Sequence, residues 1–188
     1  MRILALDLSK TSTGWASFQP GDKTLASGAW VLGSEFTPRG KVFGNLHGRM
    51  SDLETLGHID AVFYEKPLDL GAKRGRDGKP IGIGSSEAHF LLLGLAMHAE
   101  SWAEAMGCRI IREVPMGTWR SHFLKGMDRK RYVDLKAMAV AKALALGFKT
   151  RCHDQAEAIG ILDYATEVLN LPAPWHTPLQ RAITAARA

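Results

Sequence analysis

The sequence predicts a single α/β domain built around a mixed β-sheet. Its 188 residues match the length of one domain. Apolar residues make up 46% and charged residues 23% of the chain, a composition that is typical of a globular protein and excludes collagen, coiled coil and wholesale disorder. Apolar segments follow one another as three strands, a helix, a strand, a helix, a strand and closing helices. This order indicates a mixed sheet flanked by helices.

The first half of the chain predicts four strands and one helix. Residues 2–9 (RILALDLS) are rich in Ile and Leu and end in a polar cluster, which predicts a buried strand followed by a tight turn. Residues 14–19 and 24–32 predict two antiparallel strands, because a Pro-Gly-Asp turn separates them. Helical spacing of apolar residues predicts a helix over residues 43–56, and residues 59–65 predict a fourth strand that stops before a proline.

A long apolar helix, a fifth strand and two closing helices make up the rest of the predicted domain. They are expected at residues 85–106, 109–114, 132–146 and 154–169. Two prolines end the last helix. We expect the domain to span residues 1–170 and residues 171–188 to form a C-terminal tail.

Composition also limits the compartment and the class of partner. The longest apolar run, residues 90–97, is far shorter than the roughly 18 residues that a membrane helix needs, and Asp7 interrupts the N-terminal apolar stretch, which argues against a secretory signal. Cys108 and Cys152 form no spaced pattern, so we expect reduced thiols in a cytoplasmic protein without membrane contact. The 24 Lys and Arg residues against 19 Asp and Glu residues give a net charge of +5, which modestly favours a polyanionic partner.

Two segments concentrate positive charge and are candidates for contact with nucleic acid. Residues 66–84 combine basic side chains with many glycines and predict a charged loop, and residues 120–131 form a second basic stretch. Either segment could instead be a solvated loop without a ligand. Trp119 is the aromatic candidate for stacking on a base, because Gly117 and Arg120 flank it at a loop or helix start. The candidate DNA-binding residues are Lys66, Lys73, Arg74, Arg76, Lys79, Arg120, Lys125, Arg129, Lys130 and Arg131.

Four acidic residues stand at strand and helix ends, where α/β proteins build their sites. Asp7 closes the first strand, Glu65 closes the fourth, and Asp154 and Glu157 share one face of the first turn of the last helix. Taken alone, each has a structural explanation as a turn residue, a solvated strand end, an N-cap or a first-turn acid. Together they predict a shared site, because clustered carboxylates repel one another unless hard cations such as Mg²⁺ or Mn²⁺ bind between them. Two such ions about 4 Å apart support phosphodiester hydrolysis.

The segments around these acids are similar to those of the RuvC-type Holliday junction resolvases of the ribonuclease H-like superfamily, particularly the versions found in phages and prophages. The matching segments are ILALDLS followed by TGW, then FYEKP, then DQAEAIG, at residues 3–9, 13–15, 63–67 and 154–160. In this order they cover most of the predicted domain. The resemblance implies a ribonuclease H-like five-stranded sheet of order 3-2-1-4-5, flanked by helices, in which Asp7 and Glu65 become neighbours.

The resemblance also implies an activity, which is resolution of Holliday junctions by two Mg²⁺ ions per site, for which Mn²⁺ substitutes. By this analogy Asp7 bridges the metals, Glu65 and Asp154 each hold one side, and Glu157 completes the ligand set or supports it. The family usually has Asp where this chain has Glu157. His153 is a candidate for supporting a ligand or transferring a proton; otherwise it caps the helix or is solvated. A homodimer is implied, since symmetric cutting of a four-way junction needs two sites.

Three other functions stay open at the level of the sequence. A related nuclease that cuts flaps, forks or other branched DNA has the same motifs. A non-catalytic DNA-binding module explains the charge but not the four acids. Residues 7–14 (DLSKTSTG) also resemble the first phosphate loop of sugar kinases and actin-type ATPases, but those proteins need two such lobes. No GxxxxGK[ST] motif is present, so no nucleotide cofactor is expected.

Overall fold

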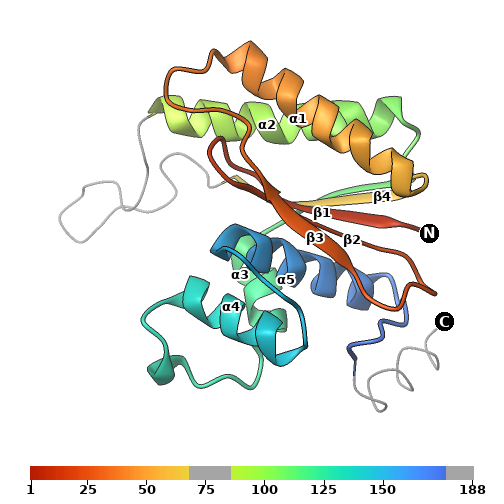
Figure 1. Ribbon diagram of the computed structural model, residues 1–188, viewed down its shortest axis with the longest axis vertical. Helices are drawn as coiled ribbons and strands as arrows, with labels where there is room; N and C mark the ends of the chain where they lie inside the picture. Colours follow the sequence, from red (N-terminus) through yellow and green to blue (C-terminus); the bar gives the residue numbers. More distant parts are fainter. Residues whose placement is uncertain (68–85, 177–188) are drawn as a thin grey trace.

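The computed structural model describes residues 1–67 and 86–176. Within them, five strands form one mixed sheet of order β3-β2-β1-β4-β5 (Figure 1), which confirms the expected order. The strands are β1 (Ile3–Asp7), β2 (Thr13–Phe18), β3 (Ala26–Trp30), β4 (Ala61–Glu65) and β5 (Ile110–Val114). β2 pairs antiparallel with both β1 and β3, whereas β1, β4 and β5 run parallel. The ends of β1 and β4 therefore lie at the same edge of the sheet.

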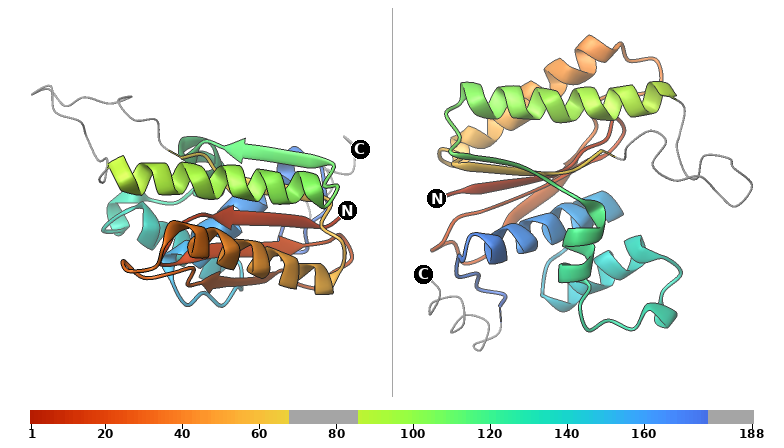
Figure 2. Two further views of the ribbon diagram at one scale, coloured as in Figure 1. Left: turned by 90° about the horizontal axis from the view of Figure 1, so that it is seen from above. Right: turned by 180° about the vertical axis from the view of Figure 1, so that it is seen from behind.

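Helices cover both faces of this sheet (Figures 1 and 2). In the described ranges they are α1 (Arg39–Leu53), α2 (Ser86–Ala105), α3 (Met116–Phe123), α4 (Leu135–Ala145) and α5 (His153–Val168), with short 3₁₀ turns at Glu54–Leu56 and Arg129–Arg131. α1 and α2 lie on one face, whereas α5 lies on the other and packs against α3 and α4. The central strand β1 serves both cores: Ile3 and Ala5 belong to the α5 side, Leu4 and Leu6 to the α1–α2 side. All four side chains are fully buried, as expected for a strand covered on both faces.

Helix α3 is not among the predicted helices and overlaps only the start of the basic stretch at residues 120–131. Pro115 directly precedes it, and Trp119 and Phe123, one helical turn apart, are buried in the same core as α5. A Cβ atom on Gly160 of α5 would lie 2.7 Å from the Trp119 ring, so this glycine permits the close approach of the two helices. Trp119, the aromatic candidate for stacking on a base, is instead a core residue, because its side chain is fully buried.

The closing part of the chain differs from the prediction at one helix start. α4 begins at Leu135 because the side chain of Asp134 accepts a hydrogen bond from the backbone N–H of Ala137 at 2.8 Å and caps the helix. Residues 171–176, expected to belong to the tail, pack on the domain, where the Trp175 ring meets Phe18 edge-on at 4.8 Å. No helix in the two described ranges is long and apolar enough to cross a membrane.

Candidate active site

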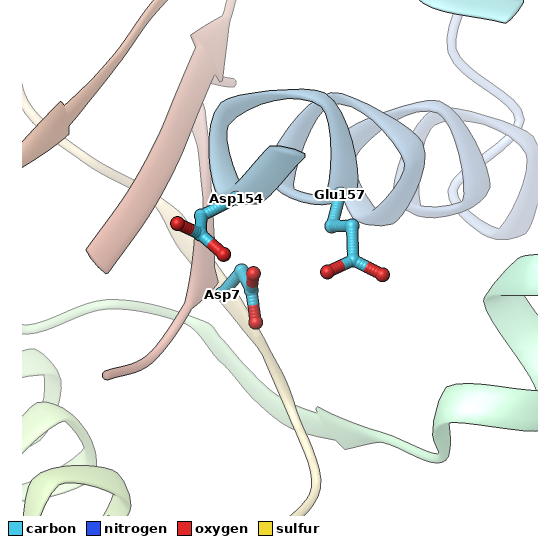
Figure 3. Close-up of side chains that lie close together, drawn as sticks. All are labelled: Asp7, Asp154 and Glu157. Carbon is cyan, nitrogen blue, oxygen red and sulfur yellow. The ribbon is translucent and has the colours of Figure 1, made fainter. Parts of the chain in front are cut away.

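Three of the four predicted acids converge at the end of β1. Asp7 is the last residue of β1, and Asp154 and Glu157 stand on the first turn of α5, with their side chains on the side that faces Asp7 (Figure 3). One carboxylate oxygen from each residue lies within 4.8 Å of those from the other two. The sequence prediction that these residues share a site is therefore consistent with the geometry.

A glycine in β2 allows this convergence. Gly14 pairs with Asp7 in the sheet register. A Cβ atom at this position would lie only 1.9 Å from the backbone carbonyl oxygen of Asp154, so the first turn of α5 packs directly on the backbone of β2. Any larger residue at position 14 would push this turn away from the sheet.

The fourth acid, Glu65, stands at the end of β4 beside the other three. Its Oε2 atom accepts a hydrogen bond from the indole Nε1 of Trp119 at 2.8 Å. Burial raises the pKa of Glu65, while the Trp119 hydrogen bond and the charge of Arg120 oppose that rise. Trp119 is thus not a DNA contact but a buried side chain that fixes the position of Glu65.

Electrostatic repulsion among the acids is evident at Asp7. Burial raises the pKa of Asp7 well above its ordinary value, and the negative charges of Glu157, Glu65 and Asp154 raise it further. Asp7 is therefore repelled by all three of the other acids. A site of this kind is unfavourable when it is fully ionised and has no cation.

Two cationic side chains partly offset this repulsion. Lys136, on the first turn of α4, places Nζ 3.5 Å from Asp154 Oδ1 and 3.4 Å from Glu157 Oε2. Arg120 of α3 pairs through Nη2 with Oε1 of Glu157, whose own side chain is only 3% exposed. Burial lowers the pKa of Lys136, but the charges of Glu157, Asp154 and Asp7 outweigh that effect and raise it.

Sequence reasoning missed Lys136, and the reason is physical. Its partners lie 18 and 21 positions further along the chain, and only the packing of α4 on α5 brings them together. The signal available was the cap residue Asp134, which marks where α4 starts and hence puts Lys136 in its first turn.

The structure places the remaining site candidates as follows. Arg120 belongs to the acid cluster, and Lys66 lies 3.1 Å from Glu113 of β5. His153 is the exposed first residue of α5. Four basic residues are exposed in the segment between α3 and α4, namely Lys125, Arg129, Lys130 and Arg131. Four candidates of the predicted basic loop lie outside the described residues, namely Lys73, Arg74, Arg76 and Lys79.

The donor set fits a hard divalent cation. Asp7, Asp154 and Glu157 offer only carboxylate oxygens, the ligands that Mg²⁺ and Mn²⁺ prefer. A bound cation would also relieve the repulsion that raises the pKa of Asp7. Mutual placement, ligand chemistry and electrostatics thus all favour a metal centre at this position.

No protein-family model matches the chain, and no curated protein sequence matches it either. Solved structures do match. RuvC of Thermus thermophilus in complex with a Holliday junction substrate aligns over 90% of this chain and 95% of its own, with a TM-score of 0.62 and 15% identity. The yeast mitochondrial Holliday junction resolvase aligns over 85% of this chain and 75% of its own (TM-score 0.51, 13% identity). The fowlpox virus Holliday junction resolvase aligns over 90% of this chain and 99% of its own (TM-score 0.50, 13% identity). The chain therefore has the fold of the RuvC-type Holliday junction resolvases.

Proposed function

We propose that this protein is a metal-dependent endonuclease that resolves Holliday junctions. The observation that carries the proposal is the convergence of Asp7, Asp154 and Glu157, with Glu65 beside them, at one edge of a RuvC-type sheet. The motifs that carry the resemblance contain these same four residues. A non-catalytic DNA-binding module would have no use for four acids that repel one another.

Asp7, Glu65, Asp154 and Glu157 would hold two divalent cations, as the resemblance implies. Bound there, Mg²⁺ or Mn²⁺ would supply an activated water and stabilise the negative charge of the leaving oxygen in phosphodiester hydrolysis. The contribution of the chain is to hold the ligands in place. Trp119 fixes Glu65, and Arg120 and Lys136 hold Glu157.

Exposed basic residues next to this site would contact the DNA backbone. Lys125, Arg129, Lys130 and Arg131 are exposed between α3 and α4, the two helices whose Arg120 and Lys136 reach the acids. Lys and Arg side chains on an exposed surface bind phosphates without reading the base sequence. The same role is proposed for Lys73, Arg74, Arg76 and Lys79, which lie outside the described residues.

A homodimer is part of the proposal, and α2 offers a surface for it. Phe90, Leu93 and Met97 are 57%, 41% and 60% exposed, and their i, i+3, i+7 spacing places them on one face of the helix. Two copies of this stripe packed about a two-fold axis would bury it and provide two catalytic sites.

Leu93→Glu should give a monomer in sedimentation velocity, while Leu144→Glu, an exposed apolar site on α4, should not. A Leu93→Glu protein that stays dimeric would place the interface elsewhere.

The proposal is tested by incubating the protein with a labelled four-way junction, a flap, a fork and a linear duplex, with and without Mg²⁺. We expect Mg²⁺-dependent cutting of the four-way junction, faster than that of the other substrates, leaving 5′-phosphate and 3′-hydroxyl ends. Preferential cutting of the flap or fork would identify the related branched-DNA nuclease instead. Tight junction binding without cutting under any metal would favour the non-catalytic module.

A further inference from the structure

A groove runs along the open edge of the sheet, next to the acid cluster but outside it. β3 is one of the two edge strands of the sheet, and the segment between α4 and α5 lies opposite it. Together they enclose a hollow of about 760 Å³. The part of its lining that matters here comprises Trp15, Ser27, Gly28, Lys149, Arg151 and Gln155.

One wall of the groove is aromatic. The rings of Trp15 and Trp30 are stacked, with centroids 5.5 Å apart and an interplanar angle of 19°. Trp15 pairs with Gly28 of the edge strand, and a Cβ atom on Gly28 would lie 2.8 Å from the indole Nε1. The glycine therefore lets the indole lie across the edge of the sheet. In the described ranges, the indole N–H of Trp15 has no hydrogen-bond acceptor, so it is available to a ligand.

The opposite wall is basic and held in place. Lys149 and Arg151 are exposed. The buried Gln155 ties their backbone to the sheet: its Nε2 donates to Ser27 Oγ at 3.0 Å and to the carbonyl of Lys149 at 3.3 Å. Its Oε1 accepts from the backbone N–H of Arg151 at 2.8 Å. The backbone positions of Lys149 and Arg151 relative to the edge strand are thus fixed by partly buried hydrogen bonds.

The groove adjoins the acid cluster along both α5 and β2. Gln155 directly follows Asp154, and Trp15 directly follows Gly14, whose backbone packs on the carbonyl of Asp154. The backbone that carries the acids therefore continues directly into the groove along both β2 and α5.

We propose that this groove binds an unpaired DNA strand, with a base stacked on Trp15 and phosphates against Lys149 and Arg151. Trp15 is half-buried and Trp30 is buried, so only the open part of the Trp15 indole is offered to a base. Aromatic rings beside cations commonly hold single strands without sequence preference. A polypeptide strand added to the edge of β3 would need no aromatic wall and no pair of cations, so the lining favours nucleic acid. The inference rests on the proposed function for its substrate, since a branch point supplies unpaired nucleotides beside the cut.

Binding of a short fluorescent oligothymidine, measured by anisotropy in EDTA, tests the proposal without any cleavage. The double variant Lys149→Gln, Arg151→Gln should bind about 10-fold more weakly, and its slope of log affinity against log salt should fall by about 1.4, the value for two lost phosphate contacts on a single strand. The control Lys41→Gln, Arg49→Gln removes the same charge from α1 on the other face of the sheet and should change neither value.

A second measurement keeps the test independent of the charge change. Oligothymidine carrying 5-iododeoxyuridine should crosslink under light to the peptide that contains Trp15. Equal affinity of the groove and control variants, or crosslinks only to other peptides, would overturn the groove proposal even if the wild-type protein cuts junctions. Conversely, a groove that binds oligothymidine in a protein that cuts no branched DNA would overturn the proposed function alone.

Discussion

Replacement of Gly14 by alanine tests the link between strand packing and catalysis. The new Cβ atom would lie 1.9 Å from the carbonyl oxygen and 2.3 Å from the carbonyl carbon of Asp154, well inside the 3.0 Å that Cβ contacts respect. Both atoms belong to the backbone, so no side-chain rotation relieves the clash. The first turn of α5 must therefore move by about 1 Å or more, and Asp154 and Glu157 move with it.

The expected consequence is a large loss of activity with a moderate loss of stability. A displacement of about 1 Å at a catalytic site costs on the order of 100-fold in rate, while overpacking typically costs about 1–3 kcal/mol of unfolding free energy. Single-turnover cleavage of a four-way junction measures the first effect, and thermal unfolding followed by circular dichroism measures the second.

The matched control is Gly44→Ala in α1, where the added Cβ atom meets nothing within 4 Å. It should leave the cleavage rate unchanged and stabilise the helix slightly. A Gly14→Ala protein that cleaves within a few-fold of wild type and unfolds at the same temperature would refute the reasoning, because the turn that carries the acids would then not depend on this contact.

Three further predictions follow from the charges of the described residues. The folded-state pKa of Asp7 is raised, so its contribution to folding stability is complete below about pH 4 and is lost as pH rises. Asp7→Asn should therefore raise the melting temperature at pH 7 in EDTA while abolishing cleavage. An unchanged or lower melting temperature would contradict this expectation. Glu157→Gln should nearly eliminate Mg²⁺-supported cleavage, whereas Glu157→Asp should keep a fraction that Mn²⁺ rescues better than Mg²⁺; near wild-type rates for Glu157→Gln would exclude this residue as a ligand. Burial alone would raise the pKa of Asp163, but hydrogen bonds from His122, His176 and Trp175 lower it well below its usual range. Asp163 therefore contributes to folding stability above about pH 4, and this contribution is lost as pH falls below that value. Asp163→Asn should lower the free energy of unfolding by about 2–3 kcal/mol at pH 7 and flatten the fall of stability at acid pH. If stability still falls as steeply at acid pH in this variant, other groups must cause the fall.

Local patterns were sufficient to predict the five strands, four of the five helices in the described residues, and the candidate acids. The apolar run that ends at Asp7, the run that ends at Glu65 and the apolar last helix each mark their element by composition and spacing alone. The order of the strands did not come from these patterns. It came from the resemblance, because periodicity within one strand says nothing about which strand lies beside it.

The missing parts of the site are those that depend on long-range packing. Trp119 has the sequence context of a loop residue, but the absence of a side chain at Gly160 lets it pack beneath α5 and donate to Glu65. Lys136 meets its partners only because α4 packs on α5. Arg120 was predicted on charge to contact DNA, yet the structure pairs it with Glu157. A single sequence shows that such a residue is charged, but it does not show which distant residue it pairs with.

The central claim is that the acid cluster cuts a four-way junction with a divalent cation. The most direct measurement is gel analysis of a junction labelled on each strand in turn, incubated with purified wild-type protein or with Asp154→Asn, in Mg²⁺ or in EDTA. The account predicts paired cuts in two opposite strands by the wild-type protein in Mg²⁺, and none in EDTA or with Asp154→Asn. Cutting that persists in EDTA, or that the variant performs at the wild-type rate, would contradict it.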